Sequence, residues 1–343
     1  MAPPLNRATK QIVALSCCFS ANNVIHERNL RWSNERKIGL SDSSAQETPF
    51  HPAVIGLALT LLEGLICRPS SSRPTGCASR CWNRVSETGW RFACTDFRST
   101  QSPWRHQIPV LARMGYRVWA VNQRGYGRTT RPTQVADYTL PHFLDDVMAL
   151  IDAAHAESVV LIGHDWGARV AWCFAAQQRR PLDRLVIMNV PHPPCFRAAL
   201  KHWPQMRKSW YVAFFQLPRL PERMLAVNGG AIVRRMFSDV ALPPDVLAVY
   251  IRQITAPGAA TAMLNWYRAI RLLSSRTLNL AQVIDVPTLV VWGDRDVALD
   301  PICLNGTERY IRDLTVKRLP GVSHWVQQDA PQVVNELLQE FLA

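Results

Sequence analysis

The sequence has no cysteine pattern typical of a zinc site. Its 343 residues include nine cysteines, an odd number, and no second Cys or His pair follows the closely spaced Cys77 and Cys81 at ligand distance. Free thiols persist in a reducing compartment. We therefore expect a cytoplasmic protein with no structural metal, and no motif in the chain indicates a cofactor.

Long apolar runs are also missing. The run Ile12–Leu15 follows basic residues, as in a secretory signal, but Ser16 and Ser20 interrupt it. A second run, Ala53–Cys67, contains Glu63 and is shorter than the roughly 20 residues that a membrane helix needs. The sequence thus predicts neither export nor a membrane span.

Acidic residues are fewer than basic ones, and the formal net charge is +13. Such an excess favours encounters with nucleic acid or anionic surfaces. The chain has no nucleic-acid motif and no basic stripe interleaved with aromatic residues. We interpret the charge as a solvated basic surface and expect no nucleic-acid partner.

Two unlike regions follow one another along the chain. Residues 1–100 are rich in Ser, Arg, Cys and Pro, which favours loop or disorder, and no strands can be recognised there. From about residue 104 onward, apolar strands alternate with amphipathic helices, as in a mostly parallel sheet with helices on both faces. The predicted strands are 116–121, 159–162, 185–189, 287–292 and 315–319, and the predicted helices are 140–156, 166–178, 300–312 and 331–342.

An insertion interrupts this alternation. The segment between the strands at 185–189 and 287–292 contains stretches rich in Trp, Tyr, Pro and helix-forming residues. We therefore predict three parts: an atypical N-terminal region at 1–100, an α/β core at 101–192 and 281–343, and an inserted helical cap at 193–280.

A candidate nucleophile lies between an apolar strand and a helix. The pentapeptide Gly163-His164-Asp165-Trp166-Gly167 has the place and spacing of a nucleophile elbow, with an aspartate at its centre. Its glycines allow a sharp turn that projects the central side chain from the sheet. An aspartate that only caps the following helix is the alternative interpretation.

Two later motifs supply the partners that such a nucleophile needs. Asp294 and Asp296 follow a predicted strand, where a carboxylate can orient a histidine. His324 lies in a loop between the last strand and the last helix. Nucleophile, acid and histidine then occur in the order typical of hydrolase triads.

With these motifs in place, the chain from about Trp104 to the C-terminus resembles the epoxide hydrolase branch of the α/β-hydrolases. The stretches that carry the resemblance are Trp104-Arg-His-Gln-Ile-Pro, Asn122-Gln-Arg-Gly-Tyr-Gly-Arg, the Asp165-Trp166 pair, Asn189-Val-Pro-His-Pro-Pro and Leu264-Asn-Trp-Tyr-Arg. The resemblance implies an α/β-hydrolase fold, and a small apolar epoxide and water as substrates. Neither the particular epoxide nor the oligomeric state follows from it.

The resemblance also assigns roles to residues. Asp165 would attack the epoxide to form an ester, while the cap residues Tyr211 and Tyr267 grip the epoxide oxygen. His324, oriented by Asp296 in preference to Asp294, would activate the water that hydrolyses the ester. The backbone N–H of Trp166 would be one donor of the oxyanion hole.

One family motif is missing. The second oxyanion donor normally comes from a His-Gly-x-Pro loop ahead of the Trp104 stretch, where this chain has Thr95-Asp96-Phe97-Arg98. An altered or misread N-terminal coding region would explain the difference, and so would a divergent member of the family.

Two other functions stay open. A haloalkanoate or haloalkane dehalogenase uses the same ester chemistry, but it stabilises a departing halide with Trp, His or Asn donors, and the tyrosine pair argues against it. The missing loop favours the other alternative, a non-catalytic hydrolase-like protein.

Overall fold

The computed structural model of the chain describes residues 10–16, 103–127, 129–226, 231–238, 240, 242–272 and 282–343. Several predictions for the first hundred residues lie outside these ranges. They are the loop or disorder predicted for most of residues 1–100, and the predictions for the run Ala53–Cys67, the pair Cys77 and Cys81, and the segment Thr95–Arg98.

A six-stranded sheet, parallel throughout, forms the centre of the described structure, and its strand order is β2-β1-β3-β4-β5-β6. The strands are β1 (Lys10–Ser16), β2 (Arg117–Asn122), β3 (Ser158–His164), β4 (Arg184–Met188), β5 (Thr288–Gly293) and β6 (Leu314–Leu319). The predicted α/β-hydrolase fold with a parallel sheet is confirmed.

Strand β1 differs from the sequence prediction, because it lies within residues 1–100, the region predicted to be separate from the core. It pairs with β2 on one side and β3 on the other, in parallel register from Gln11 to Ser16. Residues Gln11 to Leu15 are fully buried. A short apolar run has the same composition in a signal segment and in a buried strand, so periodicity alone could not identify it.

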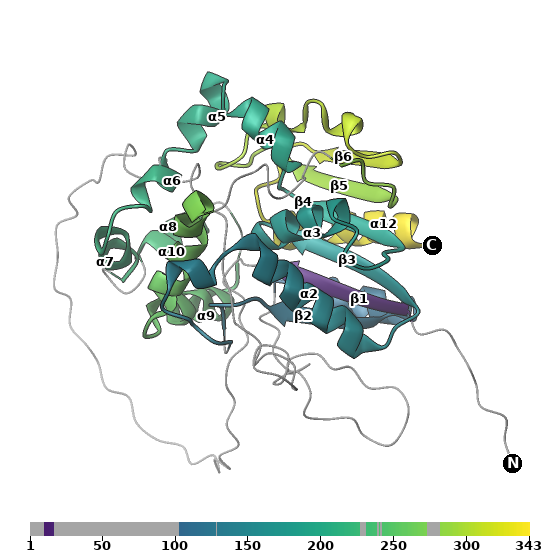
Figure 1. Cartoon of the computed structure of the whole chain (residues 1–343), viewed down its shortest axis with the longest axis horizontal. Helices are drawn as coiled ribbons and strands as arrows, with labels where there is room; N and C mark the ends of the chain where they lie inside the picture. The colour runs from purple at the N-terminus through teal and green to yellow at the C-terminus, as the bar shows by residue number, and fades with distance from the viewer. Residues whose placement is uncertain are drawn as a thin grey trace, which may run out of the picture.

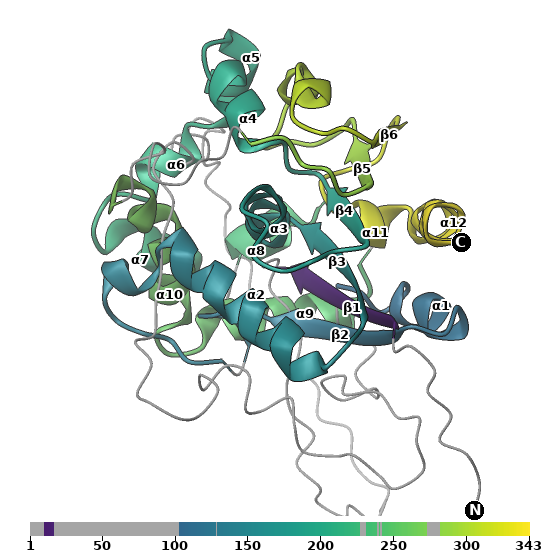
Figure 2. The same cartoon turned by 45° about the vertical axis from the view of Figure 1, so that its right-hand side comes forward.

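Helices cover both faces of the sheet, as Figure 2 shows, with α2 and α3 on one side and α1 and α12 on the other. Alternate residues of β1 enter the two resulting cores: Leu15 packs with α2 and α3, and Ile12 packs with α1 and α12. The core helices are α1 (Ile108–Arg113), α2 (Leu140–Ala154), α3 (Trp166–Ala176), α11 (Val326–Asp329) and α12 (Pro331–Leu342), with a short 3-10 turn, η2 (Val135–Asp137), ahead of α2.

The helix predicted at 300–312 is wrong. Two short 3-10 segments, η5 (Pro301–Leu304) and η6 (Thr307–Arg309), occupy this range instead. Gly306 separates them in a left-handed conformation, with φ of +85°. A left-handed residue interrupts the run of helical dihedral angles, and only local backbone geometry shows this.

Between β4 and β5 the chain leaves the sheet and forms a group of helices, which we call the inserted helices (Figure 1). They are α4 (Pro193–Ala199), α5 (Trp203–Lys208), α6 (Tyr211–Phe214), α7 (Leu220–Ala226), α8 (Ala231–Met236), α9 (Pro244–Thr255), α10 (Ala259–Arg268) and η4 (Ala269–Leu272). Their place in the chain is the one predicted for the cap.

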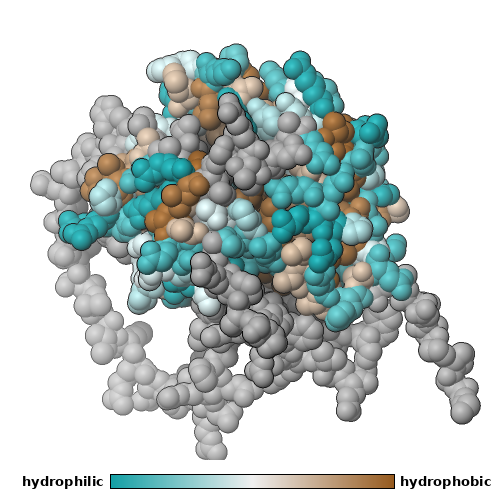
Figure 3. Space-filling model, in the orientation of Figure 1, coloured by the Kyte–Doolittle hydropathy of each residue, from teal (hydrophilic) through white to brown (hydrophobic). Residues whose placement is uncertain are grey.

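The surface of the described part is mixed in polarity. Hydrophilic residues cover much of the face shown in Figure 3, and apolar residues form separate patches among them. Within the described ranges, no helix combines the length and apolar character that crossing a bilayer requires.

Close contact between β1 and α3 connects the unexpected strand to the elbow. A Cβ atom added to Gly167 would lie 2.3 Å from the carbonyl oxygen of Leu15. That contact is with backbone, so α3 or β1 would have to move. Only glycine therefore permits this helix-to-strand distance.

A Gly167→Ala substitution is expected to lower the free energy of unfolding by about 1–3 kcal/mol through overpacking. Urea unfolding measures this change. Gly115→Ala is the control, because its added Cβ would meet nothing within 4 Å and only its positive φ of +88° opposes the change. Gly167 lies within α3, where alanine by helix propensity alone would raise the free energy of unfolding, so an unchanged or higher value in Gly167→Ala would contradict the close packing of β1 against α3.

Candidate active site

Asp165 lies at the corner between β3 and α3, as the elbow motif predicted. Its backbone has φ of 52° and ψ of −128°, a conformation that non-glycine residues rarely adopt. Gly163 permits the corner, because a Cβ there would lie 2.6 Å from the Cα of Ala168. The side chain of Asp165 is 27% exposed.

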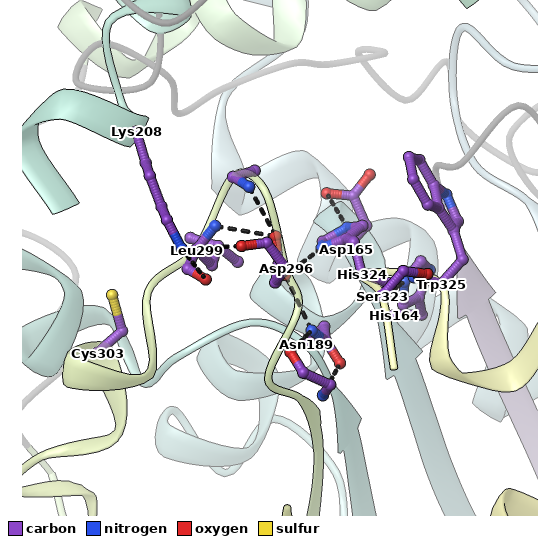
Figure 4. Close-up of polar contacts among 12 residues, drawn as sticks. His164, Asp165, Asn189, Lys208, Asp296, Leu299, Cys303, Ser323, His324 and Trp325 are labelled. Carbon is purple, nitrogen blue, oxygen red and sulfur yellow. Dashed lines mark hydrogen bonds and ion pairs between the residues drawn. The ribbon is translucent and has the colours of Figure 1, made fainter. Parts of the chain in front are cut away.

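His324 faces this carboxylate from the loop after β6. Its Nε2 is 3.8 Å from Asp165 Oδ1, and its side chain is 9% exposed (Figure 4). The distance is longer than a hydrogen bond. A histidine at this separation can act on a water molecule beside the carboxyl group.

Asp296 holds the other nitrogen of the histidine. The Nδ1–H of His324 donates to Asp296 Oδ2 at 2.6 Å. Asp296 Oδ1 accepts from the backbone N–H groups of Ala298 at 2.7 Å and Leu299 at 2.9 Å. Burial alone would raise the pKa of Asp296, but His324 and the hydrogen bonds lower it below its ordinary value. The carboxylate is therefore available to orient the ring.

Asp294, the rival for this position, lies elsewhere. Its Oδ1 accepts from Arg318 Nε at 2.9 Å, and Arg318 is a residue of β6. The structure thus brings Asp296, not Asp294, to His324.

Asn189 completes the surroundings of the Asp296 carboxylate, a role that sequence reasoning missed. Its Nδ2 donates to Asp296 Oδ2 at 2.9 Å, and its Oδ1 accepts from the N–H of Gly293 at 2.8 Å. Asn189 itself has a positive φ of 46°, which asparagine tolerates better than most residues. The sequence signal for this role was an asparagine directly after a buried strand. The predicted parallel sheet places that strand end at the same edge as the end of β5.

His164 binds the backbone of the loop that carries His324. Its ring is fully buried, and its Nε2–H donates to the carbonyl oxygen of His324 at 2.9 Å. Burial, aided by the neighbouring His324, lowers the pKa of His164 to about 4. His164 is therefore neutral near pH 7 and holds the backbone of the loop.

The two predicted tyrosines lie together among the inserted helices. Tyr211 on α6 and Tyr267 on α10 have ring centroids 6.1 Å apart, and both side chains are half-buried. Tyr267 packs edge-on against Trp166, the residue after Asp165, with centroids 5.3 Å apart. The inserted helices thus bring this pair to the elbow.

Trp266, next to Tyr267 in the chain, belongs to the core instead. It is fully buried and stacks on Phe143 with centroids 3.7 Å apart. Its indole N–H donates to the carbonyl oxygen of Arg124. Its burial makes it a packing residue.

Of the two predicted sources of oxyanion donors, the structure describes Trp166. Trp166 is the first residue of α3, a position whose N–H has no acceptor within the helix. Strand β1 ends at Ser16, opposite His164, at the same edge of the sheet. The segment Thr95–Arg98 lies outside the described residues. Where side chains are described, no group of three or more His, Cys, Asp or Glu residues is arranged to hold a metal ion.

Comparison with known proteins agrees with this geometry. A family model described as alpha/beta hydrolase fold matches residues 94–331. Epoxide hydrolase 3 of Xenopus tropicalis is 34% identical over 250 residues, which span 70% of this chain and 67% of that protein. Epoxide hydrolase 4 of Homo sapiens is 31% identical over 308 residues, spanning 80% of this chain and 83% of that protein.

The fold is similar to that of a solved epoxide hydrolase. The crystal structure of the Bacillus megaterium epoxide hydrolase in complex with an inhibitor superposes with a TM-score of 0.64. The two sequences are 26% identical, and the match covers 70% of this chain and 88% of that chain.

Proposed function

Since this chain belongs to the α/β-hydrolase fold family and to its epoxide hydrolase branch, we propose that it opens an epoxide to a vicinal diol through an ester on Asp165. The observation that carries the proposal is the placement of His324 Nε2 at 3.8 Å from Asp165 Oδ1, with Asp296 on the other side of the ring. That placement provides a nucleophile, Asp165, and a base, His324, that can activate water to hydrolyse the ester on Asp165.

In the first step Asp165 attacks a ring carbon of the epoxide. A carbon–oxygen bond to the carboxylate forms as the strained carbon–oxygen bond of the ring breaks. The epoxide oxygen leaves as an alkoxide, which takes a proton from Tyr211 or Tyr267. Phenol donors stabilise the charge that develops on this oxygen.

In the second step water releases the product. His324, held by Asp296, takes a proton from water, and the resulting hydroxide attacks the carboxyl carbon of the ester. The oxyanion that forms is stabilised by the N–H of Trp166. Collapse breaks the ester bond, and His324 returns its proton to the leaving diol. The proton left on the Asp165 carboxyl group passes to the tyrosine that gave up its own in the first step, which restores both residues. These steps need no cofactor.

The inserted helices would serve as the cap over this site. They carry both tyrosines, and Tyr267 contacts Trp166 beside the nucleophile. In this proposal residues 193–280 form the cap, and 101–192 with 281–343 form the core.

The tyrosine pair provides a test of its own. Tyr211→Phe and Tyr267→Phe are each expected to lower the rate of ester formation by about 100-fold, because each removes one donor to the leaving oxygen. Rapid-quench measurement of ester formation gives this rate. Tyr310→Phe, which removes a hydroxyl from a ring stacked on His192, is the control and should leave the rate unchanged. Unchanged rates in both Tyr211→Phe and Tyr267→Phe would remove the pair from the mechanism.

The reaction class is tested by two assays on the unmodified protein. We expect diol from an aromatic epoxide such as styrene oxide, and no chloride from chloroacetate or a chloroalkane. Chloride release without diol would indicate a dehalogenase. Neither product from folded protein would favour the non-catalytic alternative.

A further inference from the structure

The helix α5 contacts the turn that carries Asp296. Gln205 and Lys208 lie three residues apart, a spacing that puts both side chains on one face of a helix. Both reach the turn at residues 296–300, which follows β5 (Figure 4 shows Lys208).

Lys208 binds the two ends of this turn. Its ammonium group donates to the carbonyl oxygen of Asp296 at 2.8 Å and to that of Leu299 at 3.4 Å. It also lies 3.3 Å from the carboxylate of Asp300. One cation therefore holds three acceptors of the turn, and its side chain is 21% exposed.

Gln205 binds the middle and the end of the turn. Its Nε2 donates to the carbonyl oxygen of Ala298 at 3.1 Å, and its Oε1 accepts from the N–H of Asp300 at 2.7 Å. The same oxygen accepts from the thiol of Cys303. Gln205 is fully buried, so these hydrogen bonds satisfy amide groups that water cannot reach.

The turn determines where the Asp296 carboxylate points. Asp296 Oδ1 accepts from the N–H groups of Ala298 and Leu299, two residues of the same turn. A shift of these N–H groups therefore rotates the carboxylate and moves Oδ2, the atom bonded to His324. Gln205 and Lys208 bind the carbonyl oxygens of the same two residues, Ala298 and Leu299.

We propose that α5 is a positioning element for catalysis, in which Gln205 and Lys208 fix the 296–300 turn and thereby hold Asp296 against His324. This inference rests on the proposed function, because it assigns Asp296 and His324 to ester hydrolysis. Neither Gln205 nor Lys208 touches the reacting atoms.

The inference has a kinetic signature. Attack by Asp165 on the epoxide does not use His324, whereas hydrolysis of the ester does. Loosening the turn should therefore slow hydrolysis by about 10- to 100-fold, as small misplacements of a catalytic group do, and leave ester formation within about threefold. The maximal rate falls, and KM falls with it, because ester accumulates.

The experiment compares Lys208→Met with the unmodified protein in a single turnover of styrene oxide, with intact mass following the rise and decay of the ester. Lys208→Arg, which keeps a cationic donor, should restore most of the decay rate. Lys201→Met removes an exposed lysine just ahead of α5 and should change neither rate. Circular dichroism establishes that each variant is folded.

Four results are distinguishable. Slow decay with normal ester formation in Lys208→Met, rescued by Lys208→Arg, supports the positioning role. Equal decay rates in Lys208→Met and the unmodified protein overturn it, as does an equal loss in both steps. If the unmodified protein turns styrene oxide over without an ester, the proposed function fails first.

Discussion

A His324→Gln variant exposed to an aromatic epoxide is expected to accumulate an ester on Asp165, with an increase in intact mass equal to that of the epoxide. Asp165 can still attack, because it needs no base, but glutamine cannot take the proton from water. Turnover should fall by at least about 10³-fold. Intact mass spectrometry, followed by peptide mapping, measures both the adduct and its position.

The matched control is His202→Gln, the same substitution at an exposed histidine ahead of α5. It should show normal turnover and no lasting adduct. A His324→Gln protein that is folded, turns over normally and carries no adduct would exclude His324 as the base. An adduct that maps to another residue would instead exclude Asp165 as the nucleophile.

Asp165→Ala is expected to abolish both the ester and the diol, with a loss of turnover on the order of 10⁴-fold or more, as when other covalent nucleophiles are removed. The remaining groups could still bind the epoxide, but no carboxylate would be left at the elbow to attack it. Diol formation and intact mass are the measurements, and an epoxide-dependent adduct on this variant would contradict the assignment.

Asp294→Ala is the control for that experiment and also separates the two candidate acids. Whereas His324 is bonded to Asp296, Asp294 pairs with Arg318. Its removal costs an exposed ion pair, which contributes about 0–1 kcal/mol. We therefore expect turnover within about threefold of the unmodified protein. A large loss in Asp294→Ala would return this residue to the relay role.

The elements that position the nucleophile could be predicted from local pattern. The strand predicted at 159–162 and the helix at 166–178 match β3 and α3 closely, because an apolar run, a glycine turn and an amphipathic segment are each encoded by adjacent residues. The last helix, predicted at 331–342, has the observed bounds of α12. Such features depend on neighbouring residues alone.

Other elements could not be predicted this way. The segment at 300–312 was predicted as one helix, but Gly306 adopts a left-handed conformation and divides it into two 3-10 segments. β1 is a short apolar run far ahead of the next strand in the chain. Its identity as a strand depends on hydrogen bonds to β2 and β3, and no sequence window contains those partners.

The amino-acid sequence by itself determined the parallel α/β pattern, the elbow at Asp165 and the order in which nucleophile, acid and histidine occur, because periodicity and motif spacing are local properties. The resemblance favoured Asp296 over Asp294, and the tertiary structure brings Asp296 to His324. Only the tertiary structure decided that Asn189, Gln205 and Lys208 hold that carboxylate and its turn. Asn189 directly follows β4 and Asp296 follows β5, two strands that the sheet order places side by side, while Gln205 and Lys208 come from α5 in the insertion between them.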